Sequence, residues 1–161
     1  MLARRFLAAL SFGLLASAAL AQASHAFDLT GTWSGKWSCQ GFDGAPFKSS
    51  EKQSTLTISQ TGNVIAANID GGFSYNGGAL PDNGAPDTKG EAALVQCGTD
   101  NLPHAGPEAE ILRAKVKVSP EKGTGSFKGL AIIESSFPDV LTCKYSYKRV
   151  DTANPNVPAC P

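Results

Sequence analysis

The stretches GTWSGKWSC at Gly31–Cys39 and LTCKYSYKRV at Leu141–Val150 decide the fold of this chain. In both, aromatic or apolar side chains alternate with polar ones, and this period of two predicts half-buried strands. If the stretches lie antiparallel with Cys39 opposite Cys143, their aromatic residues share one face and the other face is uniformly polar. A slip of one residue would destroy this separation, so we predict that the first and last strands pair in this register.

The same register brings together side chains that stabilise one another. Trp33 comes opposite Arg149, which predicts a cation–π contact. Trp37 comes opposite Tyr145, an aromatic pair, and the facing cysteines predict a cross-strand disulfide. Because the first strand pairs with the last, the sheet closes on itself and we predict a barrel.

The rest of the chain repeats the alternation between clusters of glycine and proline. In Glu110–Val118, for example, Leu112 and Val116 share one face while Arg113 and Lys117 share the other. Strands at short intervals, joined by turns, are typical of all-β sandwiches and barrels. We therefore predict an all-β fold, a single antiparallel up-and-down barrel of about eight strands. These strands are expected at Gly31–Cys39, Ser54–Gln60, Asn63–Ile69, Phe73–Tyr75, Glu91–Cys97, Glu110–Val118, Gly125–Glu134 and Leu141–Val150.

The first 26 residues of the 161 have the pattern of a secretory signal peptide. Arg4 and Arg5 precede an apolar run at Phe6–Leu15, acids are absent, and small residues follow at A-x-A sites. Cleavage is expected after Ala21, Ala23 or Ala26, which leaves a barrel domain over 27–150 and a Pro-rich tail over 151–161. Without Arg4 and Arg5, 12 basic and 14 acidic residues remain, so the formal charge becomes 12 − 14 = −2.

Export governs how the four cysteines are interpreted. In a secreted or periplasmic protein an even number of cysteines favours disulfides, and the chain has no C-x2-C spacing typical of zinc or redox sites. Cys39–Cys143 follows from the strand register and leaves Cys97–Cys160, which would pin the tail to the barrel. Cys97–Cys143 remains an alternative pairing.

Composition and motifs exclude several classes of function. The mature chain has no basic excess to suggest nucleic-acid binding and no apolar run near the ~18 residues of a membrane-spanning helix. It has neither a G-x-S-x-G nucleophile motif nor a phosphate-binding loop, so we expect no enzyme and no cofactor. We expect a monomer or a weak oligomer.

The sequence also contains few candidate metal ligands. His104 is the one histidine certain to remain after cleavage, and Glu108 and Glu110 lie near it, but a second histidine to complete the usual ligand set is absent. We therefore interpret His104 as an exposed loop residue. The acidic group in the glycine-rich segment lacks the spacing and the closing glutamate of a calcium loop: Asp82, Asn83 and Asp87.

The candidate ligand contacts are aromatic. Trp37, Tyr145 and Tyr147 fall on the predicted inner face, and Phe73 and Tyr75 begin the glycine-rich segment 71–90 and are candidates to line or cover a mouth. A barrel of this size either holds one small ligand or is filled by side chains, so these aromatics either contact a ligand or fill the core. The alternative for segment 71–90 is a short edge strand followed by a solvated loop.

The opening DLTGTW at Asp28–Trp33 resembles the Gly-x-Trp start of the calycins, which include lipocalins, fatty-acid-binding proteins and avidins. The resemblance implies an eight-stranded barrel in which Trp33 plugs one end. In lipocalins an arginine near the last strand packs over this tryptophan, a structural role that the resemblance gives to Arg149. A further avidin biotin-site motif is not found, so biotin binding is not implied.

Two hypotheses of function follow. The first is an exported binding module that carries a small, partly apolar ligand, based on the inner aromatics and the Gly-x-Trp resemblance. The second is a secreted interaction or inhibitor domain that binds a protein through its loops at 71–90 and 98–107 and has a barrel filled by side chains.

Overall fold

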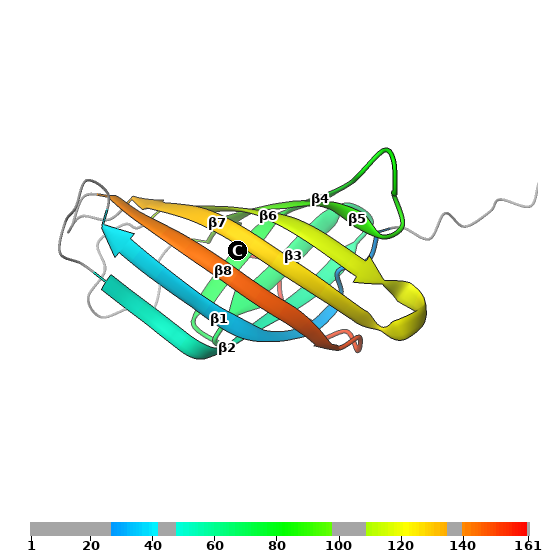
Figure 1. The fold of residues 1–161 in the computed structure, drawn as a ribbon, viewed down its shortest axis with the longest axis horizontal. Helices are drawn as coiled ribbons and strands as arrows, with labels where there is room; N and C mark the ends of the chain where they lie inside the picture. The colour runs from blue at the N-terminus through cyan, green and yellow to red at the C-terminus, as the bar shows by residue number, and fades with distance from the viewer. Residues whose placement is uncertain (1–26, 42–47, 98–108, 135–139, 161) are drawn as a thin grey trace, which may run out of the picture.

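The computed structural model describes residues 27–41, 48–97, 109–134 and 140–160. They form one closed, antiparallel, up-and-down barrel in which each strand pairs with its neighbour in the chain and β1 pairs with β8 (Figure 1). The predicted fold class is therefore confirmed. The strands are β1 (Gly31–Gly41), β2 (Lys48–Thr61), β3 (Val64–Ile69), β4 (Phe73–Pro81), β5 (Lys89–Gln96), β6 (Ala109–Ser119), β7 (Thr124–Glu134) and β8 (Val140–Asp151).

The pairing of β1 with β8 has the predicted register. Trp33 lies opposite Arg149, Trp37 opposite Tyr145, and the strands remain in this register to Gly41. The facing cysteines form the Cys39–Cys143 disulfide, with their Cα atoms 4.0 Å apart. The outward positions of both strands are mostly polar and exposed, as the alternation predicts, with the 62% exposed Val150 as an exception.

Trp33 and Arg149 close one end of the barrel, called here the Trp33 end. The Trp33 ring is fully buried, and its Nε1 donates a hydrogen bond to the carbonyl oxygen of Leu29 at 3.1 Å. The Arg149 guanidinium lies 4.8 Å from the ring centroid and donates to the carbonyl oxygen of Asp28. Burial lowers the pKa of Arg149, and the Asp28 carboxylate opposes this shift. The segment before β1 is thus held against the base of the barrel.

The glycine-rich segment is more regular than we predicted. The expected strand Phe73–Tyr75 is too short, because β4 continues to Pro81, and β4 is an internal strand of a closed barrel rather than an edge. A Cβ added at Gly77 would lie 1.9 Å from the carbonyl oxygen of Ala93, so the neighbouring backbone requires glycine there. The connection to β5 is a hydrogen-bonded turn, in which the Asp82 backbone N–H donates to the Lys89 carbonyl at 2.8 Å.

β2 also begins earlier than predicted, at Lys48 rather than Ser54. The added residues are mostly exposed and polar, so hydrophobic alternation does not mark them. They pair with the end of β1 beyond a bulge between Gly35 and Trp37. The single described helical turn is the 3-10 turn η2 (Pro120–Lys122) between β6 and β7, and none of the described helices has the length and apolar content needed to span a membrane.

The chain after β8 crosses the outside of the barrel. The Ser59 hydroxyl on β2 donates to the Asn154 side chain at 2.7 Å and accepts from the Val157 backbone N–H at 2.8 Å. Further on, the Cys160 backbone N–H donates to the side chain of Asn76 on β4. The Cys97–Cys160 disulfide holds the end of this tail, so the structure contains both predicted bridges and not the alternative Cys97–Cys143.

Candidate functional site

Three tyrosines fill the middle of the barrel. Tyr75 on β4 and Tyr145 and Tyr147 on β8 are 1%, 7% and 1% exposed. The rings of Tyr145 and Tyr147 are stacked, with centroids 6.3 Å apart, because residues two positions apart on a strand share a face. We call these three side chains the tyrosine layer.

A buried carboxylate joins two members of this layer. Glu110 on β6 is 3% exposed, and its Oε2 accepts a hydrogen bond from the Tyr75 hydroxyl while its Oε1 accepts one from the Tyr145 hydroxyl, both at 2.7 Å. Such bonds offset the desolvation of a buried carboxylate. Burial raises the pKa of Tyr75 and of Tyr145 above the usual tyrosine value, and the charge of Glu110 raises both further. Both phenols therefore stay protonated donors at neutral pH.

The third tyrosine belongs to a second polar group. The Tyr147 hydroxyl lies 2.8 Å from the Ser54 hydroxyl, which donates to Asp70 Oδ2 at 2.8 Å. The same oxygen accepts a hydrogen bond from Trp37 Nε1 at 3.2 Å. Burial raises the pKa of Tyr147, the hydrogen bond with Ser54 opposes that shift, and the charge of Asp70 adds to it.

The turn between β3 and β4 places Asp70 for these contacts. Asp70 has a positive φ of 54°, a conformation that aspartate and asparagine tolerate better than most residues. Its backbone N–H donates to the Thr55 carbonyl at 2.9 Å, and its Oδ1 accepts from the Thr55 N–H at 2.7 Å. One turn residue thereby links β1, β2 and the tyrosine layer.

Inward-facing apolar side chains lie at the opposite end from Trp33, called here the Cys39 end. Trp37 on β1, Phe73 on β4 and Ile133 on β7 pack against the core but are only partly buried. Trp37 is opposite Tyr145, and Phe73 precedes Tyr75 by two residues on the same face of β4. These three apolar side chains are called here the apolar rim. The Cys39 end is the one where β1, β3, β5 and β7 finish (Figure 1).

The five aromatic residues predicted to contact a ligand are thus divided between two positions. Trp37 and Phe73 belong to the partly exposed apolar rim. Tyr75, Tyr145 and Tyr147 lie below it with their hydroxyls bonded inside the protein. The tyrosines therefore belong to the core of the barrel, while the rim residues keep part of their apolar surface exposed.

Sequence reasoning did not place three polar residues of this site. Glu110 is predicted as the first residue of a strand and as a neighbour of His104, but not as a residue of the site. It lies two positions before Leu112, so the alternation alone puts it on the inner face. In the same way, Ser54 lies two positions before Leu56 on β2 and so shares its inner face. The contacts of Asp70 depend on a turn, and no local signal predicts them.

The described part of the site combines partly exposed apolar side chains with tyrosine hydroxyls that are already hydrogen-bonded within the protein. Among the residues that the structure describes, no three His, Cys, Asp or Glu side chains gather closely enough to hold a metal ion. His104 and Glu108, considered above as metal ligands, lie outside the described residues, as do the expected signal peptide and the 98–107 loop.

No protein-family model, curated protein or solved structure matches this chain.

Proposed function

We propose that this protein is an exported, calycin-like binding module that takes up a small, partly apolar molecule at the Cys39 end of its barrel. The observation that carries the proposal is the apolar rim: Trp37, Phe73 and Ile133 face inward and stay partly exposed where the core is otherwise closely covered. Aromatic walls with a few polar groups beneath them are the usual lining of a small-ligand site.

The shape of the barrel supports a ligand at this end rather than along the whole axis. Trp33, Phe127 and Leu56 are completely buried at and near the Trp33 end, and the tyrosine layer fills the middle. The ligand therefore rests on the tyrosine layer and contacts the rim, and a molecule with a flat apolar part fits such a shallow position. Two disulfides fit an oxidising compartment, which agrees with the expected export.

Binding of an uncharged aromatic dye tests the proposal. N-phenyl-1-naphthylamine becomes fluorescent in apolar sites, and we expect saturable, one-to-one binding by the mature chain. Trp37→Ala and Phe73→Ala should each weaken it by about tenfold, because each removes a large part of the apolar contact area. Val64→Ala and Leu80→Ala are matched controls, since both side chains are 66% exposed on the outside of the barrel.

The outcome decides between the two hypotheses. Saturable binding that depends on Trp37 and Phe73, but not on Val64 or Leu80, supports the carrier. Absence of saturable binding, or equal losses in all four variants, would overturn it and favour the interaction or inhibitor domain. Far-UV circular dichroism of each variant separates lost binding from lost folding.

A further inference from the structure

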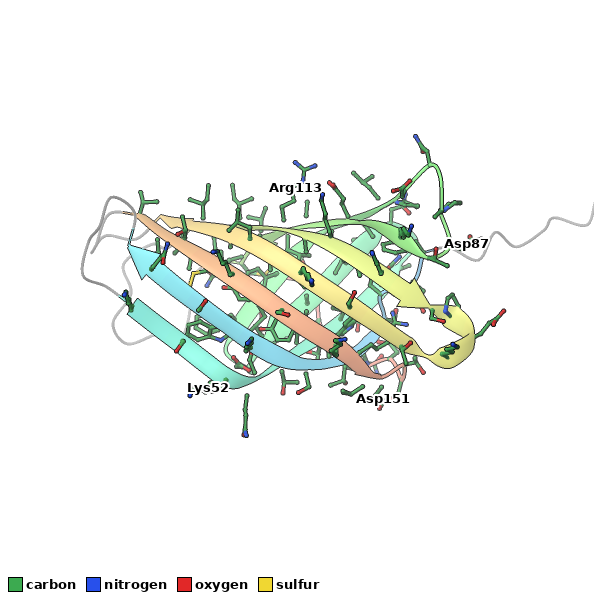
Figure 2. The ribbon with its side chains drawn as sticks, in the orientation of Figure 1. Lys52, Asp87, Arg113 and Asp151 are labelled. Carbon is green, nitrogen blue, oxygen red and sulfur yellow. A yellow bond between two sulfur atoms is a disulfide. The ribbon has the colours of Figure 1, made fainter. Side chains whose placement is uncertain are left out.

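Exposed lysines are concentrated on four adjoining strands of the barrel, although β2 and β5 also carry exposed lysines at Lys48, Lys52 and Lys89. Lysines point outward and are exposed on β1, β6, β7 and β8: Lys36, Lys115, Lys117, Lys128, Lys144 and Lys148. We call them the basic face. The described acid beside it, Glu91, is already engaged by Arg113, whose Nε donates to it at 3.0 Å. Figure 2 shows Arg113 pointing away from the barrel, on the other side of the view from Lys52.

Some of these lysines are direct cross-strand neighbours. Lys115 on β6 lies opposite Lys128 on β7, and Lys117 lies opposite Lys89 on β5. Like charges directly opposite on one face of a sheet destabilise it. The chain as a whole has as many acids as bases, so this concentration of cations is not a matter of composition. A bound anionic partner would relieve the repulsion.

Exposed apolar side chains adjoin the basic face. Val95, Ile111 and Ile132 lie side by side across β5, β6 and β7 and are 53%, 61% and 57% exposed. Leu130, 54% exposed, precedes Ile132 by two residues on β7. We call these four side chains the apolar row. Three of them, Ile111, Leu130 and Ile132, border a shallow surface depression of about 820 Å³. Glu91, Lys115 and Lys128 also line it.

We propose that this side of the barrel docks on the surface of an anionic phospholipid bilayer. The apolar row would enter the interface between headgroups and acyl chains, and the lysines would contact phosphates. The apolar row and the basic face together favour a bilayer over other partners. A purely polar anion would leave the apolar row exposed to water. A second copy of this chain would bring the lysines of the two copies against one another. The proposal does not depend on ligand binding at the Cys39 end.

Sedimentation with vesicles tests the proposal on the mature chain. Vesicles made of equal parts phosphatidylglycerol and phosphatidylcholine should pellet the protein, and pure phosphatidylcholine vesicles should not. Added salt should weaken the binding, because it screens exposed charges. Lys115→Glu/Lys128→Glu should reduce the affinity at least about tenfold, since each lysine near an anionic surface contributes to binding. Ile111→Ser/Ile132→Ser should remove the part of the binding that survives high salt.

The matched control is Lys52→Glu/Lys122→Glu, which makes the same change of charge at exposed positions outside the basic face. It should bind as the parent chain does. Equal binding to both vesicle types, or an equal loss in the control, would overturn the proposal. Retention on soluble poly-glutamate without binding to vesicles would also overturn it and would assign the face to an acidic macromolecule. The Lys115→Glu/Lys128→Glu variant exchanges one like-charge pair for another across β6 and β7, but it also places a glutamate opposite Glu91 on β5. Urea denaturation of this variant therefore separates lost binding from lost stability.

Discussion

Arg149 lies over the ring of Trp33 at 4.8 Å from the centroid, and the two residues are direct partners across β8 and β1. The arginine also donates to the Asp28 carbonyl, so it joins the segment before β1 to the last strand. The same pair of residues therefore takes part in the β1–β8 pairing that closes the barrel and holds the segment before β1 at its base.

Arg149→Met should destabilise the protein, because it removes the cation–π contact and a charged hydrogen bond while keeping much of the apolar side chain. We expect a loss of about 2–4 kcal/mol in the free energy of unfolding, measured by urea denaturation. Arg113→Met is the control: its ion pair with Glu91 has a 75% exposed arginine, and exposed pairs contribute ~1 kcal/mol or less. Equal losses in the two variants would contradict the role of Arg149.

Glu110→Ala should also be costly, because it leaves the Tyr75 and Tyr145 hydroxyls without their acceptor in the core. We expect a loss of about 2–4 kcal/mol, seen as a lower urea midpoint. Combining Tyr75→Phe and Tyr145→Phe with a Glu110→Leu change should recover part of the loss, since the polar groups then disappear together. A triple variant less stable than Glu110→Ala would show that the network is not the cause.

The chain has three tyrosines, and all three have raised pKa values in the folded barrel. In the unfolded chain they ionise near pH ~10. The folded state holds their protons more tightly, so the stability they contribute is complete below pH ~10 and declines as the pH rises above it. Tyrosinate absorbance should therefore appear in one cooperative step together with loss of the β-sheet circular dichroism. A tyrosine that titrates near pH ~10 before unfolding would contradict the buried layer.

The two disulfides should have different effects when removed. Cys97→Ser/Cys160→Ser should free the tail to limited proteolysis after Asp151 while the barrel resists, because the remaining tail contacts are a few surface hydrogen bonds. Cys39→Ser/Cys143→Ser should lower the free energy of unfolding of the barrel itself by about 2–4 kcal/mol. Mass spectrometry of the protease fragments and urea denaturation distinguish these results. If the tail stayed protected from the protease in Cys97→Ser/Cys160→Ser, this would contradict the role of the disulfide in holding the tail to the barrel.

The register of β1 and β8 could be read from the sequence because both strands alternate cleanly and one register alone separates the aromatic face from the polar face. The length of β4 could not. Gly77 and Gly78 have low strand propensity, and Gly77 is required by the backbone around Ala93, which lies on a different strand. Tertiary contact, rather than local preference, extends that strand.

In the candidate site, too, the sequence predicts which side chains face inward but not which partners they contact. Alternation correctly puts Tyr145 and Tyr147 inside, and it would have put Glu110 inside as well. It does not reveal that the tyrosine hydroxyls are bonded to Glu110 and Ser54, since those partners come from strands distant in the sequence. The position of Asp70 depends on a positive φ in a turn, and a pattern of hydrophobicity carries no information on that angle.

The pairing of β1 with β8 also determines when the protein is able to finish folding. The last strand to leave the ribosome is the one that the first strand needs, so the sheet keeps two open edges until nearly all of the chain has been synthesised. Contacts between such distant segments form slowly. Until β8 is available, the outer edges of β1 and β7 stay unpaired, and such open edges are where an incomplete sheet pairs with other chains.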